Sequence, residues 1–227
     1  MGVGLFVLIA AVVVVIAVLQ WRAKLQRRED LATWAFKNNL SYAADDPYNL
    51  PYRYAFSLFG KGEGRGAENV LSGDWKGVPV IAADYWYYTE SRDSEGRTTR
   101  DYDHFSIVIT RIEAMLPCVR IEREGVFSRL ADAIGLRDIE FESEDFNRRF
   151  NVRCDDREFA FKLLDARMIQ WLLSESGDVC VEVNGPDVLL WCKRLKPTEL
   201  APLLYRAKGF VEKVPRLVWA EYGKAAS

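Results

Sequence analysis

The sequence predicts an α+β fold, with an N-terminal transmembrane helix followed by a mainly antiparallel sheet with packed helices. Three observations predict it. Residues 1–19 carry no charged side chain. Residues 54–123 contain runs of β-branched and aromatic residues that turn-forming residues interrupt. Residues 157–174 place apolar side chains at helical spacing.

The N-terminal stretch MGVGLFVLIAAVVVVIAVL is long enough to cross a membrane, because a spanning helix needs about 20 apolar residues. Trp21 follows at the expected interface, where an amphipathic ring is favoured. A cleaved signal peptide would need basic residues before the apolar run and small residues after it. The run is followed instead by QWRAKLQRRED. We therefore assign residues 1–21 to a transmembrane helix.

A basic cluster directly after the apolar run sets the expected topology. Basic residues favour the cytoplasmic side of a span, so the sequence predicts a single-pass protein of the cell membrane with its soluble domain in the cytoplasm. A second reading is extra adhesion to anionic lipids, which Glu29 and Asp30 at the end of the cluster weaken. The basic residues are Arg22, Lys24, Arg27 and Arg28.

The amino-acid composition limits the classes of function that can be expected. Apolar residues make up 49% of the 227 positions, enough for a core, and the net charge of −2 gives no reason to expect nucleic-acid binding. The four cysteines form no CxxC pair and there is a single histidine, so neither a metal site nor a cofactor is expected. Dispersed cysteines also agree with a cytoplasmic domain.

The domain organisation follows from these limits. Residues 22–39 are expected to form a juxtamembrane helix, and residues 40–220 one soluble α+β domain with a possible subdivision near residue 125. Residues 221–227 are expected to fray. Within the domain, residues 40–55 are expected to form a loop, because they contain two prolines and Asp/Asn clusters.

The individual elements are read from local pattern. A hairpin is expected around the turn Gly73–Gly77, and a second one at residues 178–192 around the turn Asn184–Asp187. In the second hairpin Cys180 and Cys192 would point to opposite faces of the sheet. The other expected elements are strands at 54–59, 104–111 and 118–123, an extended segment at 146–154, and helices at 125–134, 157–174 and 197–214.

The segment FGKGEGRG, Phe59 to Gly66, resembles a phosphate-binding loop only in glycine content. It has no Ser or Thr after a lysine, the third glycine of a dinucleotide fingerprint is replaced by Arg65, and a strand pattern follows it. A flexible connection between two strands is the better reading.

Candidate catalytic residues are few. Asp101, Asp103 and His104 include two carboxylates and an imidazole, but a strand would place His104 on the opposite face from the other two. No GxSxG motif is present, and Cys118 follows Pro117 in an apolar stretch. We assign no catalytic residue. The sequence leaves open whether the protein is an enzyme, and it favours a protein without catalytic activity.

Two places are candidate partner surfaces. Trp86 and Tyr88 share one face of an aromatic strand, and an aromatic face is a common binding surface. Arg148 and Arg149 follow an acidic run, and local charge pairing is one reading of them. If Phe146 and Phe150 belong to the core of an extended segment, Arg148 lies on their side and needs an internal acidic partner.

The motifs AENVLSGDWKGVPVIAADYWYY, ESEDFNRRFNV and DARMIQWLL, in this order, resemble a family of uncharacterised bacterial proteins with one N-terminal membrane helix and a domain of unknown function. The resemblance covers roughly residues 30–220. It implies membrane anchoring and a shared fold, and it implies no activity, cofactor or site residue.

The sequence therefore favours a membrane-anchored protein whose cytoplasmic domain binds or scaffolds a protein partner without catalysis. The alternative is a domain that binds a lipid-like or other small ligand at the membrane face. An enzyme is the third possibility. The sequence leaves the oligomeric state open.

Overall fold

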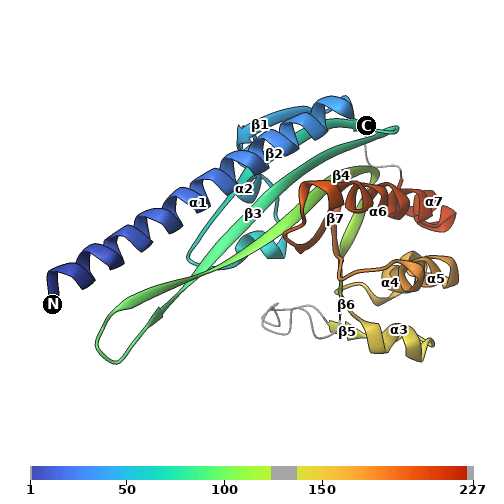
Figure 1. Ribbon diagram of the computed structural model, residues 1–227. Helices are drawn as coiled ribbons and strands as arrows, with labels where there is room; N and C mark the ends of the chain where they lie inside the picture. Colours follow the sequence, from blue (N-terminus) through green and yellow to red (C-terminus); the bar gives the residue numbers. More distant parts are fainter. Residues whose placement is uncertain (1, 124–136, 224–227) are drawn as a thin grey trace.

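A single helix of 36 residues, α1 (Gly2–Lys37), opens the chain and projects from the body of the molecule (Figure 1). At ~1.5 Å per residue it is about 54 Å long. The structure is a computed structural model, and it describes residues 2–123 and 137–223. The predicted membrane and juxtamembrane segments are thus parts of one continuous helix.

The body is built on a seven-stranded sheet in which every pairing is antiparallel. The strand order is β1-β2-β3-β4-β6-β5, and β7 also pairs with β4. The mainly antiparallel sheet predicted from the sequence is confirmed. The strands are β1 (Ser41–Asp45), β2 (Gly64–Trp75), β3 (Val78–Arg92), β4 (Thr98–Arg123), β5 (Arg137–Ile139), β6 (Phe150–Cys154) and β7 (Cys180–Lys193).

Helices pack on both faces of the sheet, and each face has its own core. The smaller core contains residues of α2 (Leu50–Arg53) and of the 3₁₀ helix η1 (Ser57–Gly60), such as Leu50 and Phe59. The larger core contains residues of α1 and of all the later α-helices. The later helices are α3 (Glu144–Arg149), α4 (Arg157–Leu163), α5 (Ala166–Ser174), the 3₁₀ helix η3 (Pro197–Glu199), α6 (Leu200–Lys213) and α7 (Arg216–Tyr222).

Strands β3 and β4 continue beyond their other partners as a two-stranded ribbon. Pairing of β2 with β3 ends at Tyr88, pairing of β7 with β4 ends at Phe105, and the β3–β4 ladder runs on to Arg92 and Thr98. We call residues 86–104 the β3–β4 arm. In Figure 1 the arm leaves the body on the same side as the N-terminal half of α1.

The glycine-rich segment is ordered, so the prediction of a flexible connection was wrong. Residues 57–60 form η1, and β2 already begins at Gly64. The guanidinium of Arg65 donates hydrogen bonds to the carbonyl oxygens of Phe59 and Gly62. The strand predicted at 54–59 is therefore absent. The prediction of a loop at 40–55 was also wrong, since this segment contains β1 and α2. Residues 41–45 are a strand because they pair with β2 at the edge of the sheet.

One strand, β7 (Cys180–Lys193), replaces the hairpin predicted at residues 178–192. Val183 pairs with Val119 and Val188 pairs with Thr110, so both halves of β7 run along β4 in the same direction. The ladder shifts register on both sides of the pair formed by Gly185 (φ 59°) and Leu116, and the surplus residues lie in β4. The Asn184–Asp187 segment therefore continues the strand and makes no turn. The expected placement of Cys180 and Cys192 on opposite faces is confirmed, since each lies in a different core.

The helices of the second half of the chain differ from their predicted bounds. The segment 146–154 is not extended throughout, because α3 runs to Arg149 before β6 begins. The helix predicted at 157–174 is two helices, α4 and α5, and Asp165 caps the second by accepting a hydrogen bond from the Met168 amide. The helix predicted at 125–134 lies outside the described residues.

Candidate functional site

The long N-terminal helix is joined to the sheet by a buried ion pair between Arg27 of α1 and Asp84 of β3. Arg27 Nε lies 2.7 Å from Asp84 Oδ2, and a terminal guanidinium nitrogen lies 2.6 Å from Oδ1. The other terminal nitrogen donates to the Leu195 carbonyl oxygen at 2.8 Å. Asp84 is only 5% exposed. A two-point pair fixes both the position and the rotation of α1.

A second group of polar residues surrounds this junction. Asn69, at a register shift in β2 and with a left-handed φ of 55°, donates its amide to Asp84 Oδ2 at 2.9 Å. The irregular backbone turns this side chain toward the carboxylate, as β-bulges often do. Arg194 donates to Asp84 Oδ2 at 3.0 Å, and Lys24 of α1 pairs with Glu68 at 2.6 Å.

The charge state of Asp84 follows from these neighbours. Burial alone would raise the pKa of the carboxyl group, but hydrogen bonds from Arg27 and the charge of Arg194 outweigh it and hold the pKa below the ordinary value. Asp84 is therefore ionised at neutral pH, and the junction is a permanent ion pair under physiological conditions.

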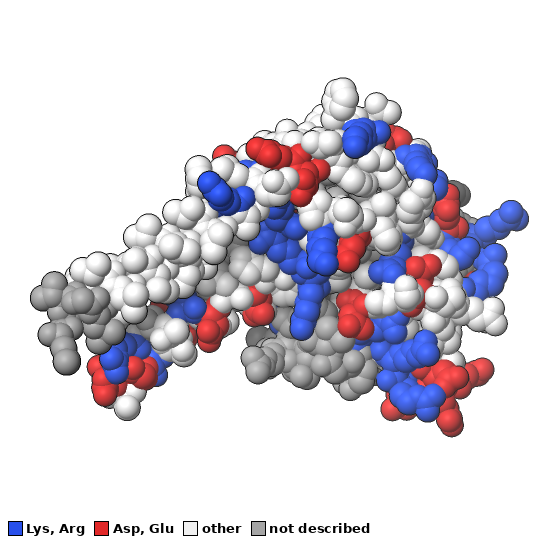
Figure 2. Space-filling view, viewed as in Figure 1, with Lys and Arg blue, Asp and Glu red and all other residues white. Residues whose placement is uncertain are grey.

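The two halves of α1 have different environments. In the second half Leu31 is 3% exposed and Ala35 is fully buried, and Trp34 stacks on Trp75 with ring centroids 5.5 Å apart. The first half is apolar on all sides, and none of the residues in its membrane-length window is buried. Figure 2 shows this half without charged side chains until it meets the body. The helix is one candidate membrane span.

The arm carries a continuous aromatic face on the same side of β3 as Asp84. Trp86, Tyr88 and Tyr102 have ring centroids 5.3–6.4 Å apart, and His104 stacks on Tyr102 at 6.2 Å. The Arg100 guanidinium lies 4.6 Å from the Tyr88 ring centroid. Tyr102 is 50% exposed. The predicted sharing of one face by Trp86 and Tyr88 is confirmed, whereas their role as a partner surface stays a prediction.

The glycines of β2 form the backing of this aromatic face. Gly64 pairs with Tyr88 and Gly66 pairs with Trp86. A Cβ at Gly64 would lie 2.3 Å from the Tyr88 ring, and one at Gly66 would lie 2.8 Å from the Trp86 ring. The rings thus lie over the strand in space that any side chain would occupy. This is the structural reason for two of the glycines in FGKGEGRG.

Arg148 and Arg149 lie in α3, on the opposite side of the body from the arm, so the structure does not bring the two candidate surfaces together (Figure 1). Arg148 is an exposed side chain that pairs with Asp145. The expectation that it lies on the core side was wrong, because a helix replaces the expected strand. Arg149 donates to the Leu173 carbonyl oxygen at the C-terminal end of α5.

The described residues offer little for catalysis. They contain no group of three or more His, Cys, Asp or Glu side chains that could hold a metal ion. Burial and the nearby Arg194 lower the pKa of His104, which favours the neutral imidazole. Burial raises the pKa of Cys118 to about 11, so this thiol is not an activated nucleophile.

The junction residues were not identified from the sequence, although a signal was present. Asp84 is the only charged residue in the apolar run VPVIAADYWYY, and a carboxylate in a buried strand needs a cationic partner. Arg27 was read only as part of a basic cluster that sets topology. Its pairing with Asp84, 57 positions away, is a tertiary contact.

Comparison with known proteins agrees with this architecture. No family model and no curated protein matches the chain. Among solved structures, the crystal structure of the mycobacterial trehalose monomycolate transport factor A, TtfA, superimposes with a TM-score of 0.58 at 14% identity. The match covers 86% of this chain and 97% of that one. At this identity the likeness concerns the fold, and the chain is a protein with a TtfA-like fold and one candidate N-terminal membrane span.

Proposed function

We propose that this chain is a single-pass cell-membrane protein whose cytoplasmic domain binds or scaffolds a protein partner and catalyses no reaction. The observation that carries the proposal is the continuity of α1. One helix has an apolar half of membrane length in which no residue of the span window is buried, and its other half is fixed to the sheet by Arg27 and Asp84. Such a helix holds the domain at a set orientation to the membrane.

The four basic residues of α1 that follow the apolar half support the cytoplasmic side. The fold likeness adds a class of partner. TtfA is described as a transport factor, so a membrane transport assembly is the first kind of partner to test. The aromatic face of the arm, which includes Trp86 and Tyr88, is the surface we assign to the membrane-proximal contact, because it lies on the α1 side of the sheet.

The proposal is tested by cross-linking in native membranes. A photo-activated phenylalanine analogue at Tyr102 should give discrete protein adducts from membranes, because this ring is exposed on the aromatic face. The control places the same analogue at Asp101, the neighbouring residue on the other face of the arm. Equal adducts at both positions, or adducts with lipid alone, would contradict the proposed partner surface.

A second candidate function is binding of a small or lipid-like ligand, which one hollow favours. This hollow of about 690 Å³ is lined by Ile81 and Ile109 together with Arg53, Arg111 and Asp187. The mixture suits an amphipathic ligand with a polar head. It lies at the start of β3, at the opposite end of that strand from the arm. Native mass spectrometry of the purified full chain would detect a retained ligand, and Ile81→Arg should abolish its retention.

A further inference from the structure

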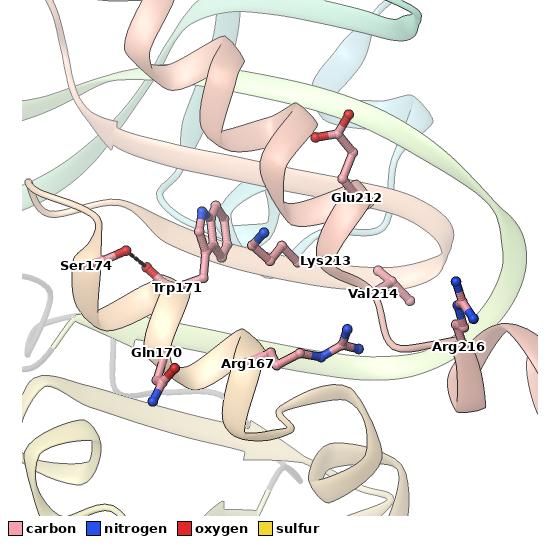
Figure 3. Close-up of a pocket in the computed structure, with 8 residues that line it drawn as sticks. All are labelled: Arg167, Gln170, Trp171, Ser174, Glu212, Lys213, Val214 and Arg216. Atoms are coloured by element: carbon pink, nitrogen blue, oxygen red, sulfur yellow. Dashed lines mark hydrogen bonds between the residues drawn. The ribbon is translucent and has the colours of Figure 1, made fainter.

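A groove of about 740 Å³ lies between α5 and the junction of α6 with α7 (Figure 3). Its cationic side chains are Arg167 from α5, Lys213 from the last turn of α6 and Arg216 from the first turn of α7. In Figure 3 Lys213 extends toward Trp171, and Arg167 reaches from α5 toward the α6–α7 junction. Three helices thus direct positive charge at one space.

These charges have few internal partners. Within residues 2–123 and 137–223, neither Lys213 nor Arg216 has a carboxylate at ion-pair distance, and Arg167 has only Asp165 at 3.4 Å. The one carboxylate that lines the groove, Glu212, is paired with Lys208 at 2.8 Å. A cation in the last turn of a helix is favoured by the helix dipole, which accounts for Lys213. It does not account for Arg167 or Arg216.

The groove also has a fixed apolar strip. Trp171 packs so closely on α6 that a Cβ at Gly209 would lie 2.9 Å from the indole ring. The ring of Phe210 lies 6.4 Å from that of Trp171. Val214, beside them, is 5% exposed. The remaining lining residues, Gln170 and Ser174, are polar. The apolar strip is held by helix packing and does not depend on a ligand.

We propose that this groove binds an acidic segment of a protein partner, with carboxylates paired to Arg167, Lys213 and Arg216 and an apolar side chain on Trp171. Clusters of cations beside an aromatic ring suit acidic peptides of this kind. A lipid headgroup of the anchoring membrane does not suit the position, because α5 and α7 lie at the end of the body remote from the N-terminal half of α1 (Figure 1).

The inference rests on the proposed binding function, and it adds a surface and the chemistry of the partner. The probe is a fluorescein-labelled peptide of alternating Glu and Leu, measured by fluorescence anisotropy with the full chain in a non-ionic detergent. The same peptide with Lys in place of Glu is the second probe. We expect the acidic peptide to bind, with an affinity that falls as NaCl is raised, and the basic peptide not to bind.

The test variant carries Lys213→Glu and Arg216→Glu, and we expect binding of the acidic peptide to weaken about tenfold or more. The control carries Arg92→Glu and Lys193→Glu. These two exposed residues lie outside the groove and form no ion pair among the described residues, and their reversal changes the net charge equally. The control should bind as the natural chain does.

Three results would overturn the proposal: no binding of the acidic peptide at low salt, equal weakening in test and control variants, or full displacement of the peptide by inorganic phosphate where NaCl of equal ionic strength leaves it bound. The last result would identify a small-anion site. None of these results would affect the cross-linking test at Tyr102, so failure of this inference is distinguishable from failure of the proposed function.

Discussion

Arg27 of the N-terminal helix α1 and Asp84 of β3 form a two-point ion pair, with nitrogen–oxygen distances of 2.7 and 2.6 Å. This pair joins α1 to the domain, although no residue of the helix's apolar span window is buried. Because Asp84 is buried, removal of Arg27 leaves its carboxylate with only Arg194 and Asn69 as side-chain donors among those described.

Replacing Arg27 by Ala should lower the free energy of unfolding by about 3 kcal/mol, because it leaves the buried Asp84 carboxylate with fewer donors. The second half of α1 should also exchange its amide hydrogens faster. Urea unfolding and hydrogen exchange of the full chain in detergent measure both effects. Arg22→Ala is the matched control, since it removes a basic residue of the same helix that has no ion pair among the described residues. Equal losses in both variants would argue against a special role for the pair.

The pH dependence of stability should carry the signature of Asp84. Its pKa in the folded protein is lower than in the unfolded chain, so its contribution is present above the unfolded pKa, about 3.9, and is lost as pH falls through the folded value. We therefore expect the stability difference between the natural chain and Asp84→Asn to be constant from pH 7 to about pH 5 and to shrink below about pH 4. A difference that instead grows on acidification would contradict this assignment.

The glycines behind the aromatic face should not tolerate a side chain. Gly64→Ala and Gly66→Ala should each destabilise the domain by about 1–3 kcal/mol, because the new Cβ would displace the Tyr88 or Trp86 ring. Gly60→Ala is the control, because a Cβ there has nothing within 4 Å. Thermal unfolding and near-UV circular dichroism follow the change. If all three variants behave alike, the rings do not lie where the structure places them.

The adjacent arginines of α3 should differ in their effect on stability. Arg149→Ala removes a donor to the Leu173 carbonyl oxygen at the end of α5 and should cost about 0.5–1 kcal/mol. Arg148→Ala removes only an exposed pair with Asp145 and should be nearly neutral. The melting temperatures of the two variants provide the comparison, and the reverse order would contradict the role assigned to Arg149.

The sequence predicted the parts of the fold that depend on local pattern. The charge-free residues 1–19 predicted the long apolar helix, and the turn at Gly73–Gly77 predicted the β2–β3 hairpin, where Lys76 and Gly77 adopt positive φ. Cys180 and Cys192 were correctly placed on opposite faces of the sheet. The predicted reversal of the chain between them was wrong, because NGPD is typical of a turn and only the long β4 ladder shows that the strand continues.

The remaining errors share a physical cause, which is dependence on distant residues. The glycines of FGKGEGRG read as flexible because the rings that pack on Gly64 and Gly66 come from β3, twenty or more positions later. Asp84 could be recognised as a buried charge, but its partner Arg27 comes from a segment read as a topology signal. Arg148 was expected in the core because an extended segment was assumed where α3 forms, with Ser143 as its N-cap.

In the proposed topology α1 anchors the chain in the membrane and the domain lies in the cytoplasm. The topology is tested by labelling Glu144→Cys, an exposed position in α3 outside the groove, with a membrane-impermeant maleimide in a Cys118→Ser background. We expect no labelling in intact cells and full labelling after permeabilisation, with the protein in the membrane fraction. Full labelling of the intact cells would place the domain outside the cytoplasm and contradict the account.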